Sequence, residues 1–241
     1  MDDAVNQTHP AAVDGRWARL GRALWPARCL VCGERGAGGR DLCRDCARAL
    51  PWNRCACPRC ALPLPVPAPA CGRCMKRPPV LDAARATFVY GAPLDRLLPR
   101  LKFHDDLAAG RLLAALMLED PGRPAPAALV AVPLARARLR ERGYDQAREL
   151  ARPLARALGL PLLEGALQRR RDTPPQSSLG ALARRRNLRG AFAAEFRAAP
   201  PARVLLVDDV MTTGATLHAA AAALRRAGVA RVEAWVCARV P

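Results

Sequence analysis

Apolar residues follow two different spacings from about residue 80 to the end of the chain. Short apolar runs predict strands at residues 85–90, 128–134, 203–210 and 229–237. Apolar positions three and four residues apart predict helices at residues 94–103, 107–118, 145–158 and 215–227. Because strands and helices alternate, we expect an α/β domain with helices on both faces of a mostly parallel sheet.

Single residues sharpen the ends of these elements. Asp145 is suited to cap the helix at 145–158, while Pro153 inside that helix predicts a kink or an earlier end. Gly228 is expected to end the helix at 215–227 before the last strand begins.

The first 80 residues have a different character. The polar opening predicts a disordered tail, and a short amphipathic helix with Trp17, Leu20 and Leu24 on one face is expected next. The following stretch is punctuated by Cys, Gly and Pro, so a bound metal would have to stabilise it. We therefore expect three parts: a tail at 1–15, a zinc-ribbon module at 16–79 and the α/β domain at 80–241.

The composition favours a soluble globular protein. The chain has 241 residues, of which 51% are hydrophobic, so it can bury a sizeable core. No apolar run approaches the roughly 18 residues that would span a bilayer. The acidic, polar N-terminus differs from a secretory signal, which predicts a cytoplasmic protein.

The charge of the chain is strongly positive. A formal net charge of +18 would attract the phosphate backbone of a nucleic acid. However, all the basic residues except Lys76 and Lys102 are Arg, and they are spread along the chain with abundant Ala and Pro. Two interpretations therefore stay open: a dedicated nucleic-acid surface, or a solvated basic surface without specificity.

Eight of the ten cysteines form four CxxC pairs, with ten residues between each pair and the next. Two such pairs complete a tetrahedral four-thiolate site that suits structural zinc, so eight ligands predict two zinc ions. The predicted ligands are Cys29, Cys32, Cys43, Cys46, Cys57, Cys60, Cys71 and Cys74. Disulfides, redox dithiols and an iron–sulfur cluster are the competing interpretations, and the absence of an export signal argues against disulfides.

Equal spacing does not decide which pairs share a zinc ion. We favour pairing in sequence order over an interleaved arrangement, because shorter loops cost less closure entropy. Cys55 and Cys237 fall outside the pattern, and we assign them no special role.

The segment VLLVDDVMTTGATL combines an apolar strand, two carboxylates and a turn rich in Thr and Gly that leads into a helix. Such strand ends are where open parallel sheets bind ligands. The turn residues Thr212, Thr213, Gly214, Ala215 and Thr216 would offer amides and hydroxyls to a phosphate at the helix N-terminus. Asp208 and Asp209 would instead suit the hydroxyls of an attached sugar, or its magnesium ion.

This segment resembles the phosphoribosyl pyrophosphate signature of type I phosphoribosyltransferases, and further motifs resemble the ComF family, which is associated with DNA uptake. Besides the CxxC pairs and DDVMTTGAT, these motifs are LKF at 101–103, VPLARARLRERGYDQ at 132–146, TPPQSSL at 173–179 and RRRNLRGAF at 184–192. The resemblance covers about residues 29–240. It implies a phosphoribosyltransferase-like fold, two structural zinc ions, and magnesium bound together with phosphoribosyl pyrophosphate.

The resemblance also assigns roles to residues. Asp208 and Asp209 would hold the ribose hydroxyls, the Thr/Gly turn would hold the 5-phosphate, and the loop after Pro133 would hold the pyrophosphate through Arg142 and Gly143. This chain has RGYDQ where the family pattern is RGFNQ, and Asp145 adds negative charge near the proposed pyrophosphate.

Two features of the middle of the chain have alternative interpretations. Residues 169–189 are basic and rich in Pro and Ser, which fits either a mobile hood over the site or a disordered linker. His104 and His218 lack a convincing catalytic constellation, so we assign them no catalytic role.

Two functions from different classes follow. The first is an enzyme, a magnesium-dependent phosphoribosyltransferase (a glycosyltransferase) acting on an unknown acceptor. The second is a non-catalytic competence protein that senses phosphoribosyl pyrophosphate or a nucleotide, with single-stranded DNA or competence proteins as partners.

Overall fold

The computed structural model describes residues 26–122, 127–171, 188 and 190–241. The chain divides into two compact units, Met1–Arg48 and Ala49–Pro241. The tail and the amphipathic helix expected before residue 25 lie outside the described residues, as does most of the segment 169–189. No helix within the described ranges is long and apolar enough to cross a membrane.

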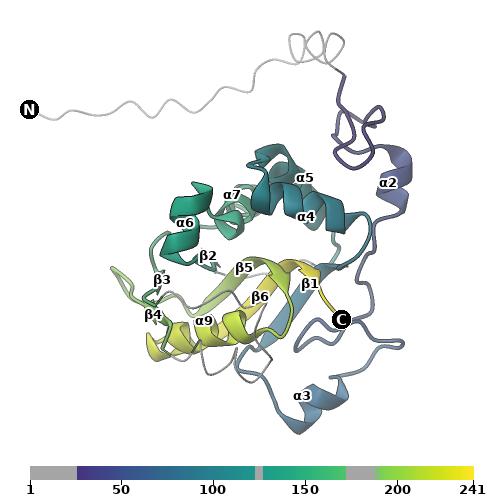
Figure 1. Ribbon diagram of the computed structural model, residues 1–241. Helices are drawn as coiled ribbons and strands as arrows, with labels where there is room; N and C mark the ends of the chain where they lie inside the picture. The colour runs from purple at the N-terminus through teal and green to yellow at the C-terminus, as the bar shows by residue number, and fades with distance from the viewer. Residues whose placement is uncertain (1–25, 123–126, 172–187, 189) are drawn as a thin grey trace, which may run out of the picture. The chain divides into compact units, whose positions relative to one another are not determined.

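A four-stranded parallel sheet forms the centre of the second unit (Figure 1). Its strands are β1 (Ala83–Val89), β2 (Ala128–Ala131), β5 (Arg203–Met211) and β6 (Arg231–Arg239), in the order β1-β6-β5-β2. In the β5–β6 pairing Met211 lies opposite Arg239, so both strands end at the same edge of the sheet. A separate antiparallel pair joins β3 (Leu167–Arg169) to β4 (Phe192–Ala194).

Helices cover both faces of this sheet (Figure 1). On one face, α5 (Leu107–Leu118) and α7 (Gln146–Leu158) pack against the sheet, and α4 (Leu94–Phe103) packs against α5. The other face packs against α9 (Ala215–Arg226). The expected α/β architecture is therefore confirmed.

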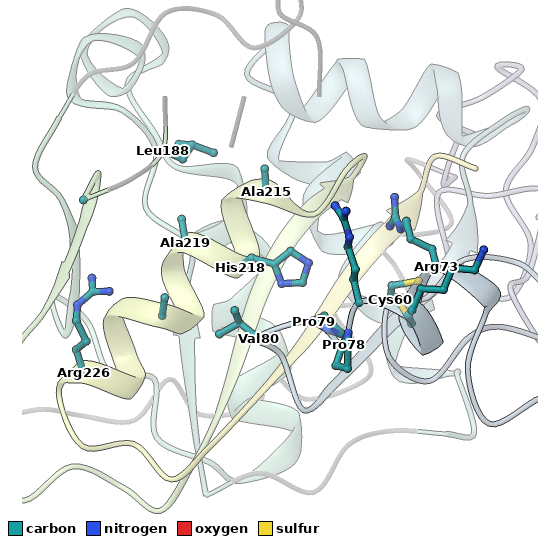
Figure 2. Close-up of a pocket in the computed structure, with 15 residues that line it drawn as sticks. Cys60, Arg73, Pro78, Pro79, Val80, Leu188, Ala215, His218, Ala219 and Arg226 are labelled. Carbon is teal, nitrogen blue, oxygen red and sulfur yellow. The ribbon is translucent and has the colours of Figure 1, made fainter. Parts of the chain in front are cut away.

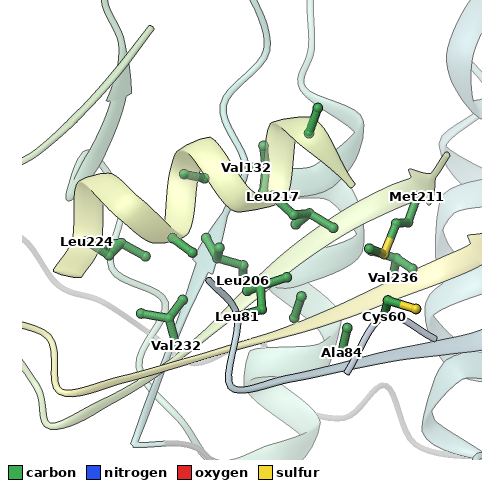
Figure 3. Packing of buried hydrophobic residues seen from close by; sticks show 14 of the residues in the cluster. Cys60, Leu81, Ala84, Val132, Leu206, Met211, Leu217, Leu224, Val232 and Val236 are labelled. Atoms are coloured by element: carbon green, nitrogen blue, oxygen red, sulfur yellow. The ribbon is translucent and has the colours of Figure 1, made fainter. Parts of the chain in front are cut away.

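The core on the α9 side also contains the second cysteine cluster. Leu217 and Leu224 of α9 pack with Leu206 and Val232 of the sheet, and Cys60 belongs to the same buried cluster (Figure 3). The helix α3 (Gly72–Lys76) follows Cys71 and carries Cys74 into this core. In the first unit, α2 (Arg44–Arg48) lies between Cys43 and the end of the unit.

Because the boundary between the two units falls after Arg48, the second cysteine cluster belongs to the same unit as the sheet. The division into a tail at 1–15, a zinc-ribbon module at 16–79 and a domain at 80–241 stays a prediction.

Several element boundaries agree with the pattern of the sequence. The bounds of α4 and α5 are those expected, and α7 begins directly after its cap, whose side chain accepts a hydrogen bond from the backbone amide of Arg148. Of the two outcomes expected at Pro153, the early end is wrong, because α7 continues to Leu158, and the kink stays a prediction. A proline removes one amide donor and crowds one turn, and the tertiary packing of the buried face of α7 outweighs that local cost.

The sequence pattern missed α6 (Arg136–Arg142) and the β3–β4 pair. None of the seven residues of α6 is buried, so the helix has no apolar stripe from which it could be recognised. Gly143 ends α6 in the left-handed conformation, with φ of 74°.

Candidate functional site

A polar cavity of about 500 Å³ lies at the carboxyl ends of β2 and β5. Eight of its lining residues are charged: Lys102, Arg138, Glu141, Arg142, Asp145, Arg169, Asp208 and Asp209. The wall also includes Pro133, Thr212 and Thr216, so the structure brings the two carboxylates, parts of the Thr/Gly turn and the arginines of the 132–146 segment into one cavity. Thr213, Gly214, Ala215 and Gly143 are not among the residues that line it.

The two adjacent carboxylates at the end of β5 have different surroundings. Asp208 accepts a hydrogen bond from the backbone amide of Asp209 at 2.9 Å, and Asp209 accepts one from the amide of Val210 at 2.5 Å. Burial, and then the nearby charge of Asp209, raise the pKa of Asp208 well above its ordinary value. This concentration of negative charge favours binding of a cation or of hydroxyl donors beside the pair.

Lys102, the penultimate residue of α4, pairs with this carboxylate site. Its Nζ lies 3.0 Å from Oδ2 of Asp209, and both side chains are mostly buried. Lys102 lies in the LKF motif at 101–103, but no role was expected for it from the sequence. The sequence signal that could have identified this residue is its residue type, because Lys102 is one of only two lysines among 39 basic residues.

The Thr/Gly turn forms the start of α9. Gly214 is its N-cap residue with φ of 75°, a conformation that glycine adopts without the steric cost of a Cβ atom. A Cβ atom added there would lie 2.5 Å from Cε of Met211, so the turn also packs closely. Oγ1 of Thr213 accepts a hydrogen bond from the amide of Ala215 at 3.4 Å. The free amides of the helix N-terminus and the Thr hydroxyls can donate hydrogen bonds to an anion, which is the binding that the sequence predicts.

Helix α6 arranges the arginines that follow β2. Arg138 and Arg142 are four positions apart, so they lie on one helical face, and both line the cavity. The guanidinium carbon of Arg142 lies 4.8 Å from the centre of the Phe103 ring, a cation–π contact that fixes its orientation. Arg140, at a different angle around the helix, is not among the lining residues.

Asp145 has a structural role that explains why an acidic residue lies beside the arginines of the cavity. Its Oδ1 accepts from the amide of Arg148 at 3.2 Å, and its Oδ2 accepts from the amide of Leu134 at 2.8 Å. The carboxylate thereby joins the start of α7 to the loop after β2. Burial raises its pKa, with those backbone hydrogen bonds opposing the change.

The eight paired cysteines form two four-cysteine sites, in sequence order. One site joins Cys29, Cys32, Cys43 and Cys46, and the other joins Cys57, Cys60, Cys71 and Cys74; within each, all sulfur atoms lie within 4.8 Å of one another. The Sγ atoms of Cys32 and Cys43, and those of Cys60 and Cys71, are 3.7 Å apart. A tetrahedral zinc ion with Zn–S bonds of about 2.3 Å requires about 3.8 Å, so the residues fit zinc.

A second cavity, of about 790 Å³, lies between the second four-cysteine site and α9 (Figure 2). His218 and Ala219 of α9 form one side, and Cys60 and Arg73 the other. Its lining includes four cationic side chains, those of Arg73, Lys76, Arg77 and Arg226, and no acidic residue among the described part of the chain.

Comparisons with known proteins support both halves of this description. Residues 20–75 match the double zinc ribbon domain family, and residues 145–241 match the phosphoribosyl transferase domain family. The chain is 37% identical to Competence protein F of Haemophilus influenzae over 174 residues, which are 68% of this chain and 76% of that protein. It is 36% identical to the DNA utilization protein YhgH of Salmonella typhi over 223 residues, 88% of this chain and 89% of that protein.

A more distant relative is Competence protein ComFC of Streptococcus pneumoniae, 27% identical over 155 residues, 64% of this chain and 67% of that protein. The match to the Salmonella typhi protein is long enough to include both the zinc-ribbon and the transferase-like parts, and the fold and the paired cysteine sites agree with both domain matches. The chain therefore belongs to the ComF family of phosphoribosyltransferase-like proteins with an N-terminal double zinc ribbon.

Proposed function

We propose that this protein binds phosphoribosyl pyrophosphate with magnesium and transfers the phosphoribosyl group to an acceptor. One observation carries the proposal: a single cavity joins two carboxylates, a helix N-terminus rich in Thr and a set of arginines. These are the three kinds of group that a ribose carrying a 5-phosphate and a diphosphate would require.

Each group has a distinct part in the proposed reaction. Asp208 and Asp209 hold the ribose hydroxyls, and the amides and hydroxyls of residues 212–216 hold the 5-phosphate. Arg142, with Arg138 beside it, stabilises the charge on the departing pyrophosphate. The bond from the anomeric carbon to pyrophosphate breaks as the bond to the acceptor nucleophile forms, so catalysis rests on placement and charge stabilisation.

Magnesium would enter beside the carboxylates. Carboxylate oxygens are suitable ligands, and a bound cation would stabilise the charged form of Asp208, whose pKa is raised by burial and then by the adjacent charge of Asp209. The ion would neutralise part of the diphosphate charge as well. Lys102 would then exchange its partner Asp209 for a phosphate oxygen.

The biological setting follows from the relatives. Competence protein F and the DNA utilization proteins are named for competence and for the use of DNA, and we propose a role in DNA uptake for this chain. We also propose that it acts in the cytoplasm, where cysteines stay reduced and available to bind zinc.

A second candidate function is a binding protein without turnover. The cavity between α9 and the second four-cysteine site favours such a binding protein, because its lining combines four cationic side chains with apolar residues such as Val80 and Ala219. Such a surface suits a nucleic acid, whose binding would weaken steeply as the salt concentration rises. Salt-insensitive binding would count against this candidate.

Calorimetric titration with phosphoribosyl pyrophosphate and magnesium tests the first proposal. The wild-type protein is compared with Asp208→Asn/Asp209→Asn, and with the control Asp95→Asn/Glu195→Gln, which removes the same charge from two exposed side chains outside the cavity. We expect binding by the wild type and the control and none by the first variant. Equal binding by all three would overturn the assignment of the site, and pyrophosphate release with candidate acceptors then separates enzyme from sensor.

A further inference from the structure

Arg239, near the end of β6, is a buried cation with an unusual set of partners. Its side chain is almost fully enclosed, with the residue 3% exposed. Its Nε donates to the carbonyl of Cys60 at 3.1 Å, and its Nη1 donates to the carbonyl of Met211 at 3.2 Å and to that of Val240. One guanidinium therefore joins a zinc-ligand loop to the end of β5.

The surroundings of Arg239 explain how a buried charge is tolerated. No carboxylate of the described residues forms an ion pair with Arg239, and burial is the main cause that lowers its pKa. Three backbone carbonyls accept hydrogen bonds from its Nε and Nη1, and four thiolates around one zinc ion leave a net negative charge at the neighbouring site. A lysine could not donate to carbonyls in this fixed planar arrangement.

Both ends of this link are firmly held. On one side, Cys60 is 1% exposed and the carbonyl of Ala61, next in the chain, accepts from the side chain of Asn53 at 2.9 Å. On the other side, the carbonyl of Met211 also accepts from the amide of Val240 at 3.0 Å. Figure 3 shows Cys60, Met211 and Val236 gathered at the same end of the buried cluster.

Met211 connects this link to the proposed phosphate-binding turn. It directly precedes Thr212, and its Cε occupies the space against Gly214, where a Cβ atom would come within 2.5 Å. A shift of the Met211 carbonyl would therefore move the turn that follows. Because the interior is closely packed, such a shift is transmitted along the chain rather than absorbed.

We propose that Arg239 is a positioning residue that couples the second four-cysteine site to the turn at residues 212–216. The zinc site then does more than hold the N-terminal module: its geometry sets the position of the turn that binds the 5-phosphate. The inference deepens the proposed function and rests on it for its ligand, phosphoribosyl pyrophosphate. The contacts themselves are independent of that function.

The first test compares Arg239→Lys with the wild type and with the control Arg231→Met, which lies in the same strand at its other end with a half-exposed side chain. Zinc content is measured together with the affinity for phosphoribosyl pyrophosphate and magnesium. We expect Arg239→Lys to keep both zinc ions and to lose between about twofold and thirtyfold in affinity, the range found for residues along a coupled network. The control should bind as the wild type does.

Wild-type binding that survives Arg239→Lys unchanged would overturn the coupling while leaving the proposed function intact. Failure of the wild type to bind would instead overturn the proposed function. A second measurement needs neither the ligand nor a variant that folds: hydrogen exchange of the wild-type protein during stepwise removal of zinc by a chelator. We expect exchange at residues 212–216 to rise with loss of the second zinc while β5 amides stay protected; an unchanged turn would contradict the inference.

Discussion

Replacing Gly214 by alanine tests whether the shape of the turn before α9 is set as the structure shows. Gly214 has φ of 75°, and an added Cβ atom would lie 2.5 Å from Cε of Met211 and 3.2 Å from Nε2 of His218. The left-handed conformation costs an L-residue about 1–2 kcal/mol, and forcing a methyl group into a packed position costs about 1–3 kcal/mol. Since Cε is the end of a flexible side chain, part of the overlap is relieved by movement of Met211.

We therefore expect Gly214→Ala to lower the free energy of unfolding by about 2–4 kcal/mol. The matched control is Gly159→Ala. Gly159 ends α7 with φ of 65°, but no atom lies within 4 Å of the position of an added Cβ, so only the backbone cost of about 1–2 kcal/mol applies. Urea unfolding measures both differences under the same conditions.

Binding separates the two variants further. Movement of Met211 shifts the turn, so Gly214→Ala should weaken binding of phosphoribosyl pyrophosphate by about tenfold or more, which corresponds to about 1.4 kcal/mol. Gly159→Ala should bind as the wild type does. The reasoning is refuted if Gly214→Ala is no less stable than Gly159→Ala and binds the ligand with wild-type affinity.

Three further predictions concern charge, capping and zinc. Folding raises the pKa of Asp208 above 3.8 through burial and then the charge of Asp209, so its contribution to stability declines as pH rises from about 4 through the folded-state pKa. Asp208→Asn should therefore unfold at higher urea concentration than the wild type at pH 7, with a difference that shrinks in acid, although it binds no ligand. Asp145→Ala should lose about 0.5–2 kcal/mol of unfolding free energy through the lost cap of α7, whereas Asp145→Asn, whose single amide oxygen can accept only one of the two backbone hydrogen bonds, should lose less than Asp145→Ala in the same urea assay. Cys32→Ser and Cys60→Ser should each lower the zinc content, but only Cys60→Ser should lower the melting temperature of the sheet unit in calorimetry, because Cys60 lies in its core.

Much of the fold could be predicted because its helices and strands carry their own periodicity. The buried stripes of α4 and α5 gave their bounds, and the apolar run in β5 placed Asp208 at a strand end. Pairing of the cysteines in sequence order also followed from a simple argument about loop length, and the sulfur geometry agrees.

Other parts of the site depend on tertiary contacts that no local pattern encodes. Lys102 and Asp209 are far apart in the sequence, and their ion pair exists because α4 packs against the edge where β5 ends. The three carbonyl partners of Arg239 are likewise invisible in the sequence, since a backbone acceptor leaves no residue type as a signal. Asp145 was expected to disturb a diphosphate site, but backbone amides occupy both of its oxygens.

These contacts give a physical reason why a zinc ribbon and a transferase-like domain occur in one chain. The second four-cysteine site is part of the core on the α9 side, whereas the first belongs to a separate compact unit. Zinc at the second site should accordingly affect the ligand cavity, and zinc at the first should not.

Hydrogen exchange of the zinc-loaded wild-type protein, with and without phosphoribosyl pyrophosphate and magnesium, tests the central claim most directly. The account predicts that the ligand slows exchange of the amides at residues 212–216 and in the segment from residue 132 to 143, because both segments contribute residues to the lining of one cavity. Slowed exchange only at other positions, or none at saturating ligand, would contradict the claim that this cavity binds phosphoribosyl pyrophosphate.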